Sequence, residues 1–174
     1  MLDISIVAMS ILCVEVAMKE INRFGIDIKK EKKECAVIYG VACIYSLLEK
    51  EISKCLRPFK LSPVKFNALM TIKHQGKNTG ISQVEISKKL IVTASNMSRL
   101  LERMEKEGLV ERISREGDKR INLIKISSKG SDLLDKAWPV YSNKLSELGM
   151  LINKSELQTL SAILLDWFTK LDNI

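Results

Sequence analysis

The chain has 174 residues, of which 28 are Lys or Arg and 21 are Asp or Glu, and its net charge is +7. A chain of this length is about one domain. It has one histidine, and its four cysteines at positions 13, 35, 43 and 55 form no C-x-x-C pair. We therefore expect no metal site and no cofactor. We also expect no enzyme, because the sequence shows no set of residues that could act together as acid, base and nucleophile.

The first 30 residues predict a helix that extends the domain at its N-terminus. Apolar residues recur at spacings of three and four between Ile4 and Ile21. The segment lacks a basic start, carries Asp3 and Glu15, and is interrupted too often for a membrane span of about 20 apolar residues. We read residues 1–30 as a buried helix in a dimer interface, and the protein as cytoplasmic with no membrane partner.

A second helix is predicted within residues 31–60, after a charged connector at 29–34. Its apolar positions again follow helical spacing: Ile38, Val41, Tyr45, Leu48, Ile52 and Cys55. Such a seam needs a partner surface. We interpret residues 31–60 as the first dimerisation helix.

Two short helices follow, each with a recognisable start. Ser62-Pro63 combines an N-cap residue with proline at the first helical position. Ser82 and Glu85 have the spacing of a capping box. These signals predict helix starts at both places.

A third helix from about Thr93 has one apolar and one polar face. The apolar stripe consists of Met97, Leu100, Leu101 and Met104. The opposite face carries Ser95, Arg99, Glu102 and Lys106, flanked by Asn96, Ser98 and Arg103. Hydroxyl, amide and guanidinium groups bond base edges or phosphates, so the sequence predicts a DNA recognition helix whose N-terminal half enters the major groove.

After Gly108, two short strands enclose a charged, glycine-containing turn, which predicts a basic hairpin or wing. A hairpin tip with arginines suits the narrow, negative minor groove. The charge distribution agrees, because residues 60–130 carry 15 Lys and Arg against 7 Asp and Glu, whereas residues 131–174 carry 4 against 6. The basic excess therefore lies where DNA phosphates would be neutralised.

The last segment, residues 128–174, predicts two more helices, the second opened by a capping-box-like Asn153 to Glu156. Its apolar positions are Leu157, Leu160, Leu164, Trp167 and Leu171. The flanking helices are too apolar to be satisfied by the small central module, so we expect a homodimer; the alternative is a bundle within one monomer. A twofold dimer would place two recognition helices about one DNA turn, roughly 34 Å, apart on a pseudo-palindromic site.

The central segment resembles the winged-helix domain of the MarR family of transcription regulators. The similarity rests on LSPVKFNALM, SQVEISKKL, TASNMSRLLERMEKEGLVER, and Asp118-Lys119-Arg120 followed by Ile126-Ser127-Ser128-Lys129-Gly130. The last two resemble the family's Asp-x-Arg wing signature and its Leu-Thr-x-x-Gly helix entry, with Ile126-Ser127 in place of Leu-Thr. The fold implied is mainly α with a small β-hairpin wing, in which residues 61–127 form the winged helix-turn-helix domain.

The resemblance also implies roles for single residues. Arg120 would reach a minor groove, Asp118 would accept hydrogen bonds that fix the wing, and Arg115 and Lys119 would contact phosphate or groove by proximity. Family members respond to small aromatic or anionic effectors, and the expected lining of such a pocket is Tyr39, Tyr45, Met70, His74, Trp138 and Tyr141. Each of these residues has packing in the core as its alternative, and His74 has a place at a helix C-terminus.

Cys35 is a candidate redox residue. It lies near a predicted helix start after Lys32 and Lys33, where the helix dipole and positive charge favour a thiolate. Cys35 followed by Tyr39 is similar to the sensing helix of the organic-hydroperoxide branch of the family. The alternative is a small apolar thiol in the core.

These features together predict a sequence-specific, DNA-binding transcriptional regulator. We expect a homodimeric repressor that binds double-stranded DNA and responds to a ligand or an oxidant. The alternative is a winged helix used for protein interaction, which would favour an apolar or acidic recognition face. RNA binding would favour stacking aromatic residues on that face, and none is present there.

Overall fold

The computed structural model describes residues 32–77, 79–90, 93–115 and 118–174. The chain divides into two compact units, residues 1–50 and residues 51–174. The helix expected within residues 1–30 lies outside the described residues. The next helix, α2, spans Lys33–Leu56 and so includes the last two residues of the expected connector at 29–34.

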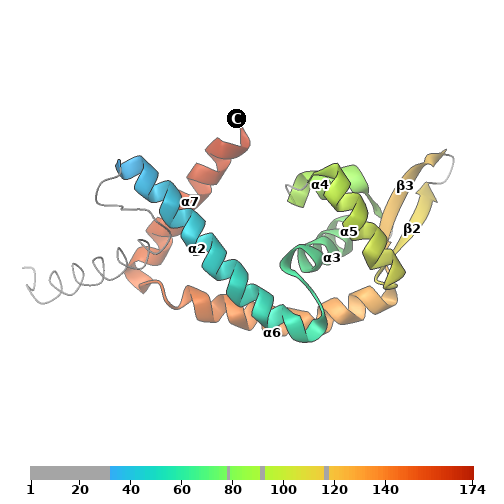
Figure 1. The fold of residues 1–174 in the computed structure, drawn as a ribbon, viewed down its shortest axis with the longest axis horizontal. Coiled ribbons are helices and arrows are strands. Elements are labelled where there is room, and N and C mark those ends of the chain that lie inside the picture. The colour runs from blue at the N-terminus through green and yellow to red at the C-terminus, as the bar shows by residue number, and fades with distance from the viewer. Residues whose placement is uncertain (1–31, 78, 91–92, 116–117) are drawn as a thin grey trace, which may run out of the picture. The chain divides into compact units, whose positions relative to one another are not determined.

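Three short helices follow α2 and a single turn of 3-10 helix at Arg57–Phe59 (Figure 1). They are α3 (Pro63–Gly76), α4 (Gln83–Leu90) and α5 (Ala94–Lys106). Ser62 caps α3, because its hydroxyl accepts a hydrogen bond from the Lys65 amide (3.2 Å). Both halves of the predicted capping box are formed at α4: the Ser82 hydroxyl accepts from the Glu85 amide (3.2 Å), and the Glu85 carboxylate accepts from the Ser82 amide (3.1 Å).

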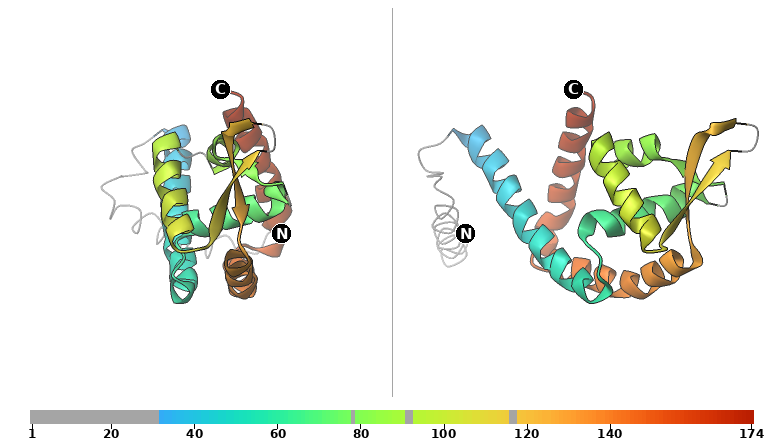
Figure 2. Two further views of the ribbon diagram at one scale, coloured as in Figure 1. Left: turned by 90° about the vertical axis from the view of Figure 1, so that its right-hand side faces the viewer. Right: turned by 45° about the vertical axis from the view of Figure 1, so that its right-hand side comes forward.

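An antiparallel sheet of three strands completes this region, in the order β1-β3-β2. The hairpin strands are β2 (Val110–Arg115) and β3 (Asp118–Ile126), with Val110 opposite Ile126. The views of Figure 2 show the hairpin extending away from the helices. Strand β1, Ile81–Ser82, was not predicted; it pairs Ile81 with Ile124 on the other edge of β3. The expected fold class, mainly α with a small wing, is confirmed.

The hydrophobic core gathers residues from every element between the end of α2 and the start of α6. Its largest fully buried side chains include Phe66 and Ile72 of α3, Ile86 of α4 and Ile124 of β3. The four apolar residues predicted for one stripe of α5 are all buried: Met97, Leu100, Leu101 and Met104. The periodicity of α5 therefore reports its inward face correctly.

Two longer helices end the chain, α6 (Ser128–Gly149) and α7 (Lys154–Asp172). The Ser127 hydroxyl caps α6 by accepting from the Gly130 amide (3.0 Å). Neither side chain–backbone bond of the expected capping box of α7 is formed; the Asn153 side-chain amide instead donates to the Glu156 carboxylate (2.9 Å). None of the described helices is both long and apolar enough to cross a bilayer.

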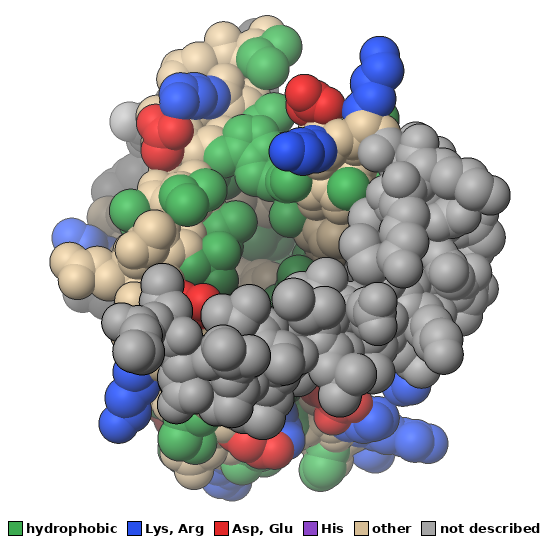
Figure 3. All heavy atoms as spheres, turned by 90° about the vertical axis from the view of Figure 1, so that its left-hand side faces the viewer, with side chains coloured by type: hydrophobic (Ala, Val, Ile, Leu, Met, Phe, Trp, Pro, Cys, Tyr) green, Lys and Arg blue, Asp and Glu red, His purple; other side chains and the backbone are tan. Residues whose placement is uncertain are grey.

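The winged-helix part and α7 differ in the burial of their apolar side chains. Helix α7 has no buried residue, and Leu157, Leu164 and Phe168 are 46%, 44% and 57% exposed. Figure 3 shows one face of the molecule on which exposed hydrophobic side chains gather in patches with charged side chains around them. An apolar helix face of this size is unusual in a monomer.

Candidate nucleic-acid interface

Helix α5 presents a polar face to solvent. Thr93 precedes it with extended backbone, and the helix ends where Gly108 takes a left-handed conformation with φ of +72°. With the apolar stripe turned into the core, the predicted outward side chains are exposed as expected: Ser95, Asn96, Arg99, Glu102, Arg103 and Lys106. The face carries three cations and one carboxylate, which gives it a positive potential suited to a polyanion.

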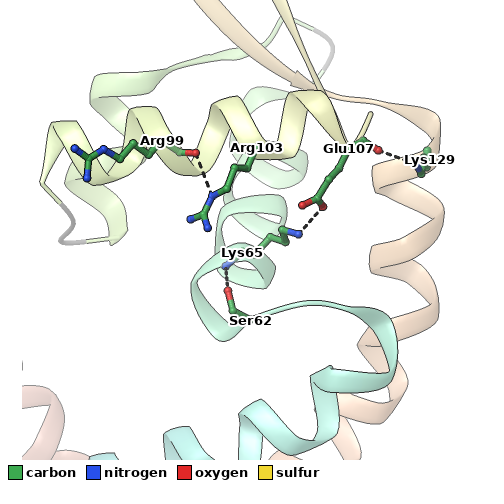
Figure 4. Close-up of polar contacts among 6 residues, drawn as sticks. All are labelled: Ser62, Lys65, Arg99, Arg103, Glu107 and Lys129. Atoms are coloured by element: carbon green, nitrogen blue, oxygen red, sulfur yellow. Dashed lines mark hydrogen bonds and ion pairs between the residues drawn. The ribbon is translucent and has the colours of Figure 1, made fainter.

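A groove of about 740 Å³ lies between this face of α5 and the start of α3. It is lined by Ser62, Val64, Asn96, Arg99, Leu100, Glu102, Arg103 and Lys106. Arg103 points from α5 toward the start of α3, and its Nε donates to the Arg99 carbonyl (3.4 Å; Figure 4). The groove therefore has two guanidinium groups along one side of α5, a chemistry suited to phosphate or base acceptors.

The acidic C-terminal end of α5 is occupied by structural contacts. The Lys65 ammonium pairs with the Glu107 carboxylate (2.5 Å), and Nε of Arg112 pairs with Glu105 (2.9 Å). Lys129 donates to the Glu107 carbonyl (2.7 Å; Figure 4). Since these contacts fix the Glu-rich end to α3, β2 and α6, the N-terminal half of α5 is the part available to a ligand.

Ser98 is not the free contact that the sequence predicts. It is half-buried, and its Oγ accepts a hydrogen bond from Nε2 of Gln83, the first residue of α4 (2.6 Å). The bond joins the two helices of the helix-turn-helix. Sequence reasoning missed Gln83, because helix periodicity within α5 carries no information about a side chain on α4.

The wing has the predicted hairpin backbone, with Arg115 opposite Asp118 next to its tip. The register shifts between Ser114 and Arg115, which increases local twist. The side chains of Arg115, Asp118, Lys119 and Arg120 lie outside the described part of the structure. Their roles stay predictions.

Comparisons with known proteins place this architecture in a family. Residues 61–121 match the sequence model of the MarR family. This match identifies residues 61–121 as a MarR-family domain.

Two curated relatives and one solved structure illustrate the similarity. The repressor MprA of Escherichia coli K12 is 28% identical over 128 residues, which cover 74% of this chain and 72% of that protein. The regulator PecS of Dickeya dadantii is 28% identical over 100 residues, and the match spans 58% of this chain and 60% of PecS. The structure of S. aureus MepR in complex with DNA superposes with a TM-score of 0.69 at 20% identity, covering 76% of this chain and 96% of that one; it shows a shared fold.

Three of the expected pocket residues come together. Met70, Trp138 and Tyr141 line an apolar hollow of about 370 Å³ between α3 and α6, with Phe66, Asn67, Thr71, Leu90 and Leu145. The rings of Phe66 and Tyr141 are 4.5 Å apart, and Phe66 stacks with Trp138 at 6.5 Å. Burial raises the pKa of the Tyr141 hydroxyl, so it stays neutral.

The other three pocket residues do not line this hollow. His74 is exposed in the last turn of α3, the position that its alternative role at a helix C-terminus requires, and its pocket role stays a prediction. Met70 and His74 share a face of α3, but His74 lies one turn further along, in the last turn of the helix, beyond the lining of the hollow. Tyr39 and Tyr45 are exposed on the part of α2 that belongs to the other unit.

The three described cysteines are free thiols, all half-buried. Cys35 is the third residue of α2, as expected near a helix start. Cys55 packs against the core and donates to the Ile52 carbonyl (3.1 Å), and burial raises the pKa of its thiol, with Lys144 opposing that shift. Among the described residues, no group of three or more His, Cys, Asp or Glu is placed to hold a metal ion.

Proposed function

We propose that this protein is a homodimeric repressor that reads a pseudo-palindromic operator with α5 of each subunit. The observation that carries the proposal is the division of α5 into a fully buried apolar stripe and a solvent face with Asn96, Arg99 and Arg103. A helix of this kind fits the major groove, and the hairpin beside it fits the flanking minor groove. MprA, a similar protein, is named a transcriptional repressor.

The proposed contacts divide by position along α5 and the wing. Ser95, Asn96 and Arg99 in the N-terminal half would meet base edges, where an arginine pairs with guanine and an asparagine with adenine. Arg103 in the groove would bond a phosphate, and on the wing Arg120 would enter the minor groove while Arg115 and Lys119 bond phosphates. Asp118 would fix the wing.

The dimer would form through the terminal helices. The apolar face of α7 and some apolar residues of α2, among them Val37, Ile44 and Tyr45, are left exposed by the part of the chain that the structure describes. A second copy supplies the matching surface by symmetry. Two recognition helices related by a twofold axis would then meet half-sites about one DNA turn apart.

The hollow between α3 and α6 is the proposed effector site. Its lining is aromatic and apolar, with Asn67 and Thr71 as the polar groups, and Trp138 is 44% exposed at the surface. Such a lining favours a flat aromatic ligand. A ligand that binds one spacing of the two recognition helices more tightly than another would shift the population toward it and so change operator affinity. A second input, oxidation of Cys35, would act through α2.

Selection of bound duplexes from a random DNA pool tests the function. We expect an enriched inverted repeat for the wild-type protein, and for Arg99→Ala a loss of discrimination of about 1–3 kcal/mol at one position of each half-site. Lys136→Ala, an exposed residue of α6, removes the same charge outside α5 and should keep the wild-type motif. No enrichment with the wild-type protein would refute operator reading and favour a protein-interaction module.

A further inference from the structure

The side chain of Gln83 bridges the two helices of the helix-turn-helix. Its amide nitrogen lies 2.6 Å from the Ser98 hydroxyl, and both residues are half-buried. Gln83 has no part in capping its own helix, because the Glu85 carboxylate takes both the amide and the hydroxyl of Ser82. Its side chain is thus left to reach α5.

This hydrogen bond fixes the orientation of the Ser98 hydroxyl proton. A serine hydroxyl has one donor proton and two acceptor lone pairs, and a free one rotates to bond either kind of partner. In this protein one lone pair is taken by Gln83, and the described residues show no hydrogen bond that the Ser98 hydroxyl itself donates. The proton is therefore the group left to offer to an incoming ligand.

Position along the helix decides what that ligand is. Ser98 lies in the N-terminal half of α5, one residue before Arg99, while the first helix of a helix-turn-helix crosses the DNA backbone. The acceptors on that surface of DNA are phosphate oxygens and the purine N7 and O6 or thymine O4 atoms of the major groove.

We propose that Gln83 is a positioning residue that holds the Ser98 hydroxyl as a hydrogen-bond donor toward an acceptor atom of DNA. The inference rests on the proposed function, since it assigns polarity to one contact of the same interface. Without Gln83 the Ser98 hydroxyl can rotate freely. Ser98 then no longer distinguishes a hydrogen-bond acceptor of DNA from a donor.

A double-mutant cycle with base-resolved readout tests the proposal. Gln83→Met keeps the length of the side chain and removes the donor, Ser98→Ala removes the hydroxyl, and the double variant combines them. For each protein, the preferred bases are read from the random pool, and the Kd is measured on the wild-type operator. We expect each single variant to weaken binding about threefold to tenfold, the worth of one hydrogen bond, and the double variant to lose no more.

The source of the acceptor appears in the same data. If Ser98 faces a base, both single variants relax the preference at the same position of each half-site; if it faces a phosphate, both weaken all sequences equally. Losses that multiply in the double variant, or changes at different positions, would overturn the proposal. A wild-type protein that enriches no motif would instead refute the proposed function.

Gln83→Glu tests the polarity. A carboxylate accepts the Ser98 proton and turns the lone pairs outward, so the contact to an acceptor is lost and the negative charge adds repulsion. Gln75→Glu adds the same charge at an exposed position in the last turn of α3 and is the matched control. We expect Gln83→Glu to bind the operator at least about threefold more weakly than Gln75→Glu; equal affinities would show that Ser98 does not act as an outward donor.

Discussion

The winged-helix region and α7 bury their apolar side chains to very different extents. Between α3 and β3 the large apolar residues pack against one another. Phe66, Ile86, Met97 and Ile124 are all at most 1% exposed. Helix α7 is no less apolar in pattern, yet it has no buried residue. At about 25 cal/mol per Å² of apolar surface, a helix face left in water forgoes stabilisation that the winged-helix core already has.

The difference separates a core that is closed within one chain from an apolar surface that would be covered only in the proposed dimer. The described residues of the winged-helix core all lie within residues 51–174. The face of α7 is stabilised only when another surface covers it, so the stability of α7 in the proposed dimer depends on protein concentration. Variants in the two regions are therefore expected to affect different measurements.

Gly130→Ala should have the largest effect, because a Cβ at this position would clash with the backbone of the winged-helix region. A Cβ at Gly130 would lie 2.1 Å from the Leu109 carbonyl oxygen, and the backbone at both residues is held by hydrogen bonds to Ser127. We expect a destabilisation of about 3 kcal/mol, measured by urea unfolding.

Gly149→Ala is the matched control. It lies at the end of α6 with nothing within 4 Å of an added Cβ. In a helix this change should stabilise by about 0.5–1 kcal/mol. Equal stabilities of the two variants would contradict the close approach of α6 to the turn after α5.

Leu164→Asp should act on association and leave the winged helix folded. The side chain is 44% exposed and lies in the predicted apolar seam of α7. A carboxylate there would lose about 2 kcal/mol or more of apolar burial in a dimer, about a 30-fold rise in its dissociation constant. Analytical ultracentrifugation over a range of concentrations measures the shift.

Gln158→Asp adds the same charge on α7 away from the seam. Its dissociation constant should stay close to the wild-type value. If both variants dissociate alike, charge rather than burial of the apolar face would explain the result, and the homodimer through α7 would lose its support.

Much of the winged-helix region is predictable because its helix caps and apolar stripes depend on residues close together in the sequence. The hydroxyls of Ser62, Ser82 and Ser127 cap the helices that follow them, each by a bond to an amide three residues later. The apolar stripe of α5 is equally local, since it needs only helical geometry. Elements whose cause lies within one turn are therefore read correctly.

The unpredicted features are pairings between distant positions. Strand β1 exists because Ile81 meets Ile124, and two residues alone carry no strand pattern. The position of Ser98 on α5 suggests an unpaired hydroxyl, but Gln83, fifteen positions earlier, donates a hydrogen bond to it. His74 fits the expected pocket by residue type, yet the turn of α3 exposes it. Periodicity shows which face of a helix is polar and leaves open what that face meets.

Arg120→Ala should have a smaller effect that is confined to DNA binding. The family resemblance places Arg120 in a minor groove, so its loss should weaken operator binding by about 1 kcal/mol and reduce the salt dependence by about one counterion. Urea unfolding should give the wild-type stability. A destabilised or dissociated Arg120→Ala protein would show that the residue supports the fold and would count against its role at the wing tip.

The smallest expected effect lies at the edge of the winged-helix region, at the start of α4. Hydrogen bonds from the Ser82 side chain and backbone lower the pKa of the Glu85 carboxyl from its ordinary value of 4.5, and Lys89 and Lys88 add to the shift. A pKa lowered by folding contributes stability that is present above the unfolded value and is lost as the pH falls through the folded value. The ionised Glu85 carboxyl should therefore add stability at neutral pH that disappears in acid.

Glu85→Gln tests this effect, because the substituted amide keeps a side-chain acceptor for Ser82 but does not titrate. The stability difference between wild type and Glu85→Gln should be constant from pH 7 to about pH 5 and then shift against the wild type below pH 4.5. Urea unfolding of both proteins across this range measures it, and parallel curves down to low pH would show that the Ser82 contacts do not favour the ionised carboxyl. The comparison also distinguishes the two regions, because a capping bond in the winged helix is formed within one chain and its pH dependence should not change with protein concentration.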